Sequence, residues 1–109
     1  MTDLAAAWTQ LETAAQAARE RRIEDLFQTE PERLDRLVVE APQVRLDLSK
    51  QPWSLADFAA AVDLARAGGV EAARDRQFAG ETVNPSEGRA ALHMALRAPK
   101  GSDFRAAGE

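Results

Sequence analysis

Histidine is the side chain best suited to proton transfer near neutral pH, and this chain contains only one, His93. Arg89 precedes it by four residues, so on a helix the two side chains would share a face. The apolar residues around His93 favour a different interpretation, a neutral histidine that is buried and hydrogen-bonded to a neighbour. We expect this structural role and predict no catalytic residue in the chain.

A metal site is not expected either. A zinc site needs about three or four ligands drawn from cysteine, histidine and carboxylates. The chain has no cysteine and a single histidine, and the residues that precede His93 match no helical metal-binding motif. We therefore predict no metal ligand.

Two groups could hold an anion and one could act as a nucleophile. Ser86 is a poor nucleophile for His93, because seven residues of helix separate the two by about 10 Å along the axis. Free amides at a helix start near Asn84 could hold a phosphate, but a plain capping role is favoured. Lys50 could attract a phosphate, yet no glycine-rich loop or hydroxyl cluster accompanies it. We predict no substrate-binding residue.

Residues 84–97 are expected to form a helix that is buried on nearly every side. Asn84 and Ser86 are natural N-caps, and Pro85 fits the first turn. Between residues 90 and 96 every side chain except the histidine is apolar, which is typical of a fully buried helix. A buried Arg89 would need carboxylate partners, so we predict an ion-pair network that ties this helix to protein outside this chain.

The rest of the sequence predicts a mainly α fold with one small β-hairpin. Trp8 is expected to anchor the first helix in a core. In the hairpin, Val44, Leu46 and Leu48 alternate with polar residues, so one face should be buried under a covering layer. Acidic residues after Thr29 favour a helix start over acid–base chemistry. Apolar spacing, caps and glycines predict helices over 3–22, 23–28, from Thr29 through Val38, 54–67 and 70–78, with the hairpin within 38–53.

Composition excludes several classes of partner. The net charge of −4 and pI of about 5.0 provide no basic surplus for binding nucleic acid or an anionic membrane. No signal peptide pattern and no apolar run of about 18 residues is present. Together with the lack of cysteine, these features predict a cytoplasmic protein that binds neither nucleic acid nor membrane.

Two segments carry a family resemblance. Residues 80–97 read G-E-x-x-N-x-x-E-x-R-A-x-L-H-x-A-L-R. This stretch resembles a segment near the N-terminus of the glucose-6-phosphate isomerase family, without gaps. A second match covers residues 45–50, where Leu48 stands in place of the family's usual aromatic residue. The resemblance spans roughly residues 23–97.

The resemblance implies the N-terminal helical part of a larger α/β sugar isomerase. Residues 1–22 would be an N-terminal helix, and residues 23–109 the beginning of the isomerase chain, without its catalytic domains. The family interconverts glucose 6-phosphate and fructose 6-phosphate through an enediol, without metal or organic cofactor. Its catalytic and phosphate-binding motifs match no residue of this chain.

The implied partners are a sugar phosphate for the full-length enzyme, the remainder of the isomerase chain, and a second subunit in a homodimer. Two alternatives remain. One is a stand-alone helical module that binds a protein partner through its alanine-rich faces. The other is a truncated product without function.

Overall fold

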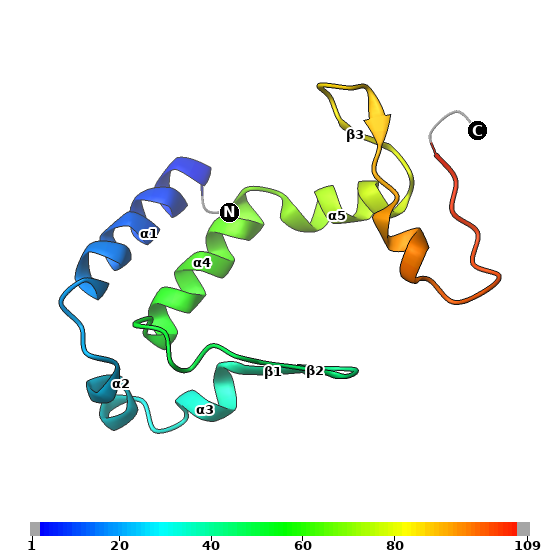
Figure 1. The fold of residues 1–109 in the computed structure, drawn as a ribbon. Helices are drawn as coiled ribbons and strands as arrows, with labels where there is room; N and C mark the ends of the chain where they lie inside the picture. Colours follow the sequence, from blue (N-terminus) through cyan, green and yellow to red (C-terminus); the bar gives the residue numbers. More distant parts are fainter. Residues whose placement is uncertain (1–2, 107–109) are drawn as a thin grey trace. The chain divides into compact units, whose positions relative to one another are not determined.

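The computed structural model describes residues 3–106, in two units that divide between Gly68 and Gly69. The first unit contains four helices and one hairpin (Figure 1). Its elements are α1 (Leu4–Ala18), α2 (Ile23–Thr29), α3 (Arg33–Arg36), β1 (Val38–Ala41), β2 (Val44–Asp47) and α4 (Leu55–Ala67). The helices and the hairpin expected within this unit are confirmed, although α1 ends at Ala18 and not at residue 22, and α3 ends before Val38.

Helix α1 packs along α4 through small side chains. Ala7 is fully buried, and Leu11, Ala14 and Ala18 are half-buried. These four residues are spaced three or four positions apart, so they lie on one face of the helix. Trp8 lies one position away from this face and is 54% exposed. The expectation that Trp8 anchors the core is therefore wrong, because the alanine positions bring the two helices together.

Helix α4 begins at a complete capping box. The Ser54 hydroxyl accepts a hydrogen bond from the Asp57 amide at 3.1 Å, and the Asp57 carboxylate accepts one from the Ser54 amide at 2.9 Å. Two backbone donors that the helix cannot satisfy itself are thereby paired. Past the end of α4, Gly69 adopts φ 70°, a left-handed conformation that suits a residue without Cβ.

Strands β1 and β2 form an antiparallel hairpin, joined by a two-residue turn of Pro42 and Gln43. Val39 pairs with Leu46, and Ala41 pairs with Val44. A further hydrogen bond from the Leu48 amide reaches a carbonyl before β1. The sequence predicted the strands correctly, but every residue of β2 is exposed. The buried face expected for Val44 and Leu46 is therefore not found within the described part of the chain.

The second unit contains a helix, a short strand pair and a 3-10 helix (Figure 1). Its elements are α5 (Val70–Phe78), β3 (Thr82–Asn84), β4 (Arg89–Ala90) and η1 (His93–Arg97). Gly80, with φ 75°, ends the segment after α5 as expected. A Cβ built at Gly80 would collide with the backbone carbonyl of Arg105, so this position also permits a close backbone approach.

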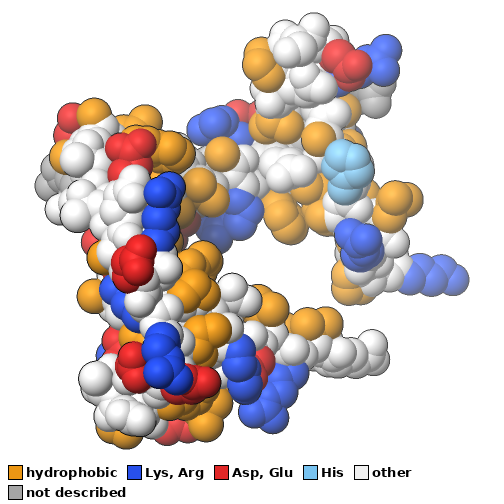
Figure 2. All heavy atoms as spheres, turned by 60° about the vertical axis from the view of Figure 1, so that its left-hand side comes forward, with side chains coloured by type: hydrophobic (Ala, Val, Ile, Leu, Met, Phe, Trp, Pro, Cys, Tyr) orange, Lys and Arg blue, Asp and Glu red, His pale blue; other side chains and the backbone are white. Residues whose placement is uncertain are grey.

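The helix expected over residues 84–97 is wrong, whereas its burial by protein outside this chain stays a prediction. Residues 85–88 form a turn that joins β3 to β4, and Gly88 adopts φ 65° within it. Asn, Pro, Ser and Gly are turn formers as well as helix caps, and here they form the turn. Leu96 is 89% exposed, and His93 is exposed too (Figure 2). This strand pair adds a second small sheet to the predicted hairpin.

Across residues 3–106, no helix is long and apolar enough to cross a lipid bilayer.

The capping box predicts a specific loss of stability. Ser54→Ala removes the acceptor for the Asp57 amide, so we expect the free energy of unfolding to fall by about 1 kcal/mol. Urea unfolding followed by tryptophan fluorescence measures this change. Asp63→Ala, at an exposed position on the same helix, is the matched control and should change stability by less than about 0.5 kcal/mol. Equal effects of the two variants would contradict a capping role for Ser54.

Candidate functional site

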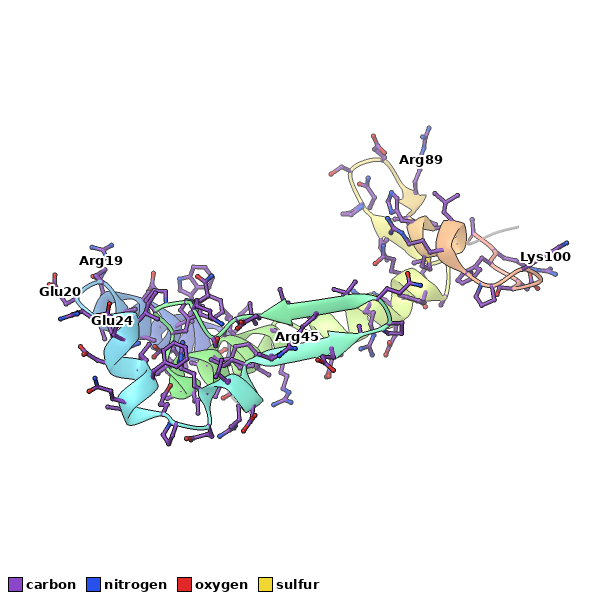
Figure 3. All side chains as sticks on the ribbon, turned by 60° about the horizontal axis from the view of Figure 1, so that its bottom comes forward. Arg19, Glu20, Glu24, Arg45, Arg89 and Lys100 are labelled. Carbon is purple, nitrogen blue, oxygen red and sulfur yellow. The ribbon has the colours of Figure 1, made fainter. Side chains whose placement is uncertain are left out.

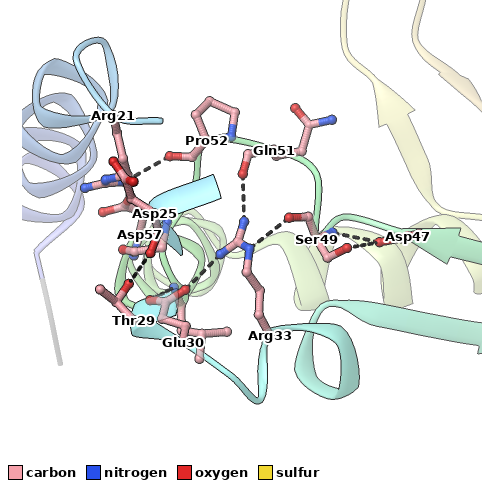
Figure 4. A network of polar contacts seen from close by, with 12 residues as sticks. Arg21, Asp25, Thr29, Glu30, Arg33, Asp47, Ser49, Gln51, Pro52 and Asp57 are labelled. Atoms are coloured by element: carbon pink, nitrogen blue, oxygen red, sulfur yellow. Dashed lines mark hydrogen bonds and ion pairs between the residues drawn. The ribbon is translucent and has the colours of Figure 1, made fainter. Parts of the chain in front are cut away.

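The most organised polar site in the first unit surrounds Arg33, a charged side chain with no exposed surface. Its Nε donates to the Ser49 carbonyl at 2.8 Å, and one terminal nitrogen donates to the Gln51 carbonyl at 2.7 Å (Figure 4). The other terminal nitrogen forms an ion pair with Glu30 at 2.8 Å. The guanidinium also lies 5.8 Å from the ring centroid of Phe27. Arginine in α3 therefore fixes the loop that follows the hairpin.

Glu30 extends this network to α4. One carboxylate oxygen accepts from Arg33, and the other accepts from the Leu55 amide at 2.9 Å. Leu55 is the first residue of α4, so this carboxylate satisfies a helix N-terminal donor that would otherwise lack a partner. Glu30 thus joins the arginine of α3 to the start of α4.

A second ion pair joins the chain after α1 to the same helix start. The Arg21 guanidinium donates to the Pro52 carbonyl at 2.9 Å and pairs with the Asp57 carboxylate. Burial tends to raise the pKa of Asp57, but hydrogen bonds from Ser54 and Arg21 outweigh it, and the net pKa is lowered. The carboxylate therefore stays ionised as part of the capping box.

Asp47, at the end of β2, organises the turn that follows. It pairs with Lys50, and it accepts a hydrogen bond from the Ser49 amide at 2.8 Å. Hydrogen bonds from the side chains of Lys50 and Ser49 lower the pKa of Asp47 far below its usual range. Lys50, weighed above as a phosphate attractant, has its ammonium group paired with this carboxylate.

The hydrogen bonds and ion pairs around Arg33 have a structural role, because they link α3, the loop after the hairpin and the start of α4. Among residues 3–106, every buried polar side-chain atom has a hydrogen-bond partner. The same residues contain no group of three or more histidine and carboxylate side chains that could hold a metal ion. Because its buried polar atoms are paired with groups of the same chain, this network stabilises the fold.

In the second unit, the residues singled out by their chemistry, except Ser86, line one open pocket at the surface. Asn84, Glu87, Arg89 and His93 all lie at its edge, with Leu96. The Asn84 side chain and Glu87 are joined by two hydrogen bonds of 3.3 Å across the turn. Arg89 pairs with Asn84 across the two strands. The fold therefore gathers these four residues, although through a turn and not through a helix face.

One sequence prediction for this region is wrong. The helix start that could have held a phosphate near Asn84 is a hairpin turn, so the expected row of free amides is not there. Arg89 is exposed (Figure 3), and within the described chain it forms no ion pair. The ion-pair network predicted for Arg89 involves protein outside this chain, so it stays a prediction.

Sequence reasoning missed Arg33 as the centre of the first unit. A glutamate three residues before an arginine, Glu30 and Arg33, was a local signal for an ion pair. The other two partners are carbonyls 16 and 18 residues downstream, for which no residue type gives a signal.

Comparisons with known proteins point to one family. A family model described as phosphoglucose isomerase matches residues 47–109. The glucose-6-phosphate isomerase of Caulobacter vibrioides is 56% identical over all 109 residues, and that of Burkholderia ambifaria is 46% identical over 96 residues, 84% of this chain. The isomerase of Anaeromyxobacter dehalogenans is 43% identical over 103 residues. The chain spans about a fifth of the length of these relatives, 18–20%.

Removal of the Arg33 guanidinium should destabilise the fold strongly. Arg33→Ala leaves the Glu30 carboxylate and two carbonyls without their donor, so we expect the free energy of unfolding to fall by about 3–5 kcal/mol. Urea unfolding and far-UV circular dichroism measure the change. Arg36→Ala, at an exposed position of the same helix, should have little effect. A small loss in Arg33→Ala would show that the network is dispensable.

Stability should also fall in acid, partly through Asp57. Its pKa in the folded chain lies below the unfolded value of about 3.9, so its contribution is complete above about pH 5 and is lost as the pH falls through about 4 and below. Urea midpoints between pH 7 and pH 3 should decline less steeply in Asp57→Asn than in the unmodified chain. Asp63→Asn, on the exposed side of α4, serves as the control. Identical slopes for all three chains would refute this assignment.

Proposed function

Since this chain belongs to the phosphoglucose isomerase family, we propose that it is the structural N-terminal part of a glucose-6-phosphate isomerase and is inactive by itself. The observation that carries the proposal is the match over all 109 residues to a relative about five times as long. In the proposed full-length enzyme, glucose 6-phosphate and fructose 6-phosphate interconvert through an enediol intermediate. This reaction needs a proton to be moved between neighbouring carbons, and so it needs a base held beside the sugar.

The geometry of the described residues supports a structural role. Arg33, which is buried, and its half-buried partner Glu30 are bonded to each other and to the backbone. The only histidine lies at the edge of an open pocket, where water has access. A base that abstracts a carbon-bound proton works best in a site that excludes water. The reacting groups are therefore assigned to the remaining four-fifths of the isomerase.

Within that enzyme the first unit would be a rigid structural element. The Arg33 network fixes α3, the loop after the hairpin and the start of α4 relative to one another. A sugar phosphate as substrate, a homodimer as the assembled form and a cytoplasmic location are parts of the same proposal, and they rest on the family.

A stand-alone helical interaction module is the second candidate. Large apolar side chains at the surface of α1, Leu4 and Trp8, favour it. The coding sequence after the Glu109 codon distinguishes the two candidates. A stop codon favours the module, whereas a continuing isomerase sequence favours the enzyme.

The purified 109-residue chain should show no isomerase activity. A coupled assay with fructose 6-phosphate, in which glucose 6-phosphate is oxidised by its dehydrogenase, measures this directly. The full-length Caulobacter vibrioides relative provides the positive control. Turnover by the short chain well above the background of the coupling enzymes would overturn the proposal that it is inactive alone.

A further inference from the structure

We propose that the apolar face of the β1–β2 hairpin is the surface on which the rest of the isomerase chain packs. This inference rests on the proposed function and assigns a specific contact surface to it. The surface, which we call the hairpin face, consists of Val39, Ala41, Val44 and Leu46.

The register of the hairpin places these four residues on one side. Val39 lies opposite Leu46, and Ala41 lies opposite Val44. Side chains of directly opposed residues project from the same face of a sheet, and neighbouring residues along a strand project from opposite faces. One face of the hairpin is therefore entirely apolar.

The other face is polar over most of its length. Glu40 lies opposite Arg45, and their side chains approach to 3.7 Å as an exposed ion pair. Figure 3 labels Arg45 on this hairpin. Val38 lies opposite Asp47, next to the turn that Asp47 organises. The hairpin thus has one face suited to water and one suited to protein.

The hairpin face is nevertheless open to solvent. Val39 is 51% exposed, Leu46 52% and Val44 61%. Figure 2 shows hydrophobic side chains at the surface among charged ones. A two-stranded hairpin is at best marginally stable in water and needs a covering layer for its apolar side. The described part of the first unit does not supply that layer.

The apolar face continues from the core of the first unit. Leu37, which is buried, and Leu48, which is half-buried, are joined by a backbone hydrogen bond of 2.8 Å at the base of the hairpin. Leu37 lies two positions before Val39, and Leu48 lies two positions after Leu46, so the Val39–Leu46 pair adjoins this part of the core. The apolar core of the first unit is therefore incomplete, because the adjoining hairpin face is not covered by described residues.

The covering layer is assigned to the remainder of the isomerase because that remainder is covalently attached. About four-fifths of the relatives' length lies outside the part that matches this chain. An attached segment competes for an apolar surface at a high effective concentration, often in the millimolar range, which a second molecule rarely matches. The occupant is therefore a segment of the same polypeptide, with an apolar surface complementary to four aliphatic side chains.

Cysteine accessibility tests this assignment, since the chain has no cysteine of its own. Leu46→Cys places a thiol on the hairpin face, and Arg45→Cys places one on the polar face as the matched control. Each variant is made in the 109-residue chain and in a full-length enzyme in which this chain replaces the homologous part of the Caulobacter vibrioides isomerase. Alkylation rates are followed by mass spectrometry of the peptide that contains the new thiol.

The Leu46→Cys thiol should react at least about tenfold more slowly in the full-length enzyme than in the short chain, because packing protects it. The Arg45→Cys thiol should react at similar rates in both. Equal rates for Leu46→Cys, or equal protection of both thiols, would overturn the inference. Protection that appears in the short chain and grows with its concentration would also overturn it, by showing that a second copy covers the face.

Isomerase activity of the unsubstituted full-length chimera tests the proposed function separately. An inactive chimera in which the Leu46→Cys thiol is protected would refute the activity and support the surface. An active chimera in which this thiol stays reactive would refute the surface alone.

Discussion

A buried guanidinium needs a hydrogen-bond partner in each direction in which it can donate, and this requirement shapes the first unit. Removing the charge of Arg33 from water is costly unless its donors are paired. One carboxylate and two backbone carbonyls provide that pairing, from positions before and after the hairpin. The loop between β2 and α4 therefore has a defined path, although it contains no regular secondary structure.

Local chemistry made much of the first unit predictable. Ser54 and Asp57 have the spacing of a capping box, and alternation around Leu46 has the period of a strand, so both elements follow from a few adjacent residues. The position of Trp8 was not predictable in the same way. The face of α1 that contains Ala7 and the face that contains Trp8 are one residue apart, which is about 100° of rotation about the helix axis. Which of the two faces is buried depends on packing against α4 and not on the sequence of α1 alone.

The second unit shows where local signals conflict. Asn84, Pro85 and Ser86 suit a helix start and a tight turn equally well, and the following glycine, Gly88, favours the turn. The family resemblance was nonetheless confirmed by the comparisons, because it depends on the order of residue types and not on the conformation that they adopt. Recognising a family and predicting its backbone are thus separate inferences, and only the first succeeded over residues 84–97.

The exposed side of the β1–β2 hairpin bears on how the protein is made. Ribosomes add about 5–20 residues per second, so the four-fifths of the relatives' length that lies outside this match takes on the order of tens of seconds to translate. The capping box and the Arg33 network use residues that lie within 36 positions of each other, and they can form while translation continues. During that interval an apolar hairpin with unpaired strand edges would be exposed on the nascent chain, and surfaces of this kind are prone to aggregation.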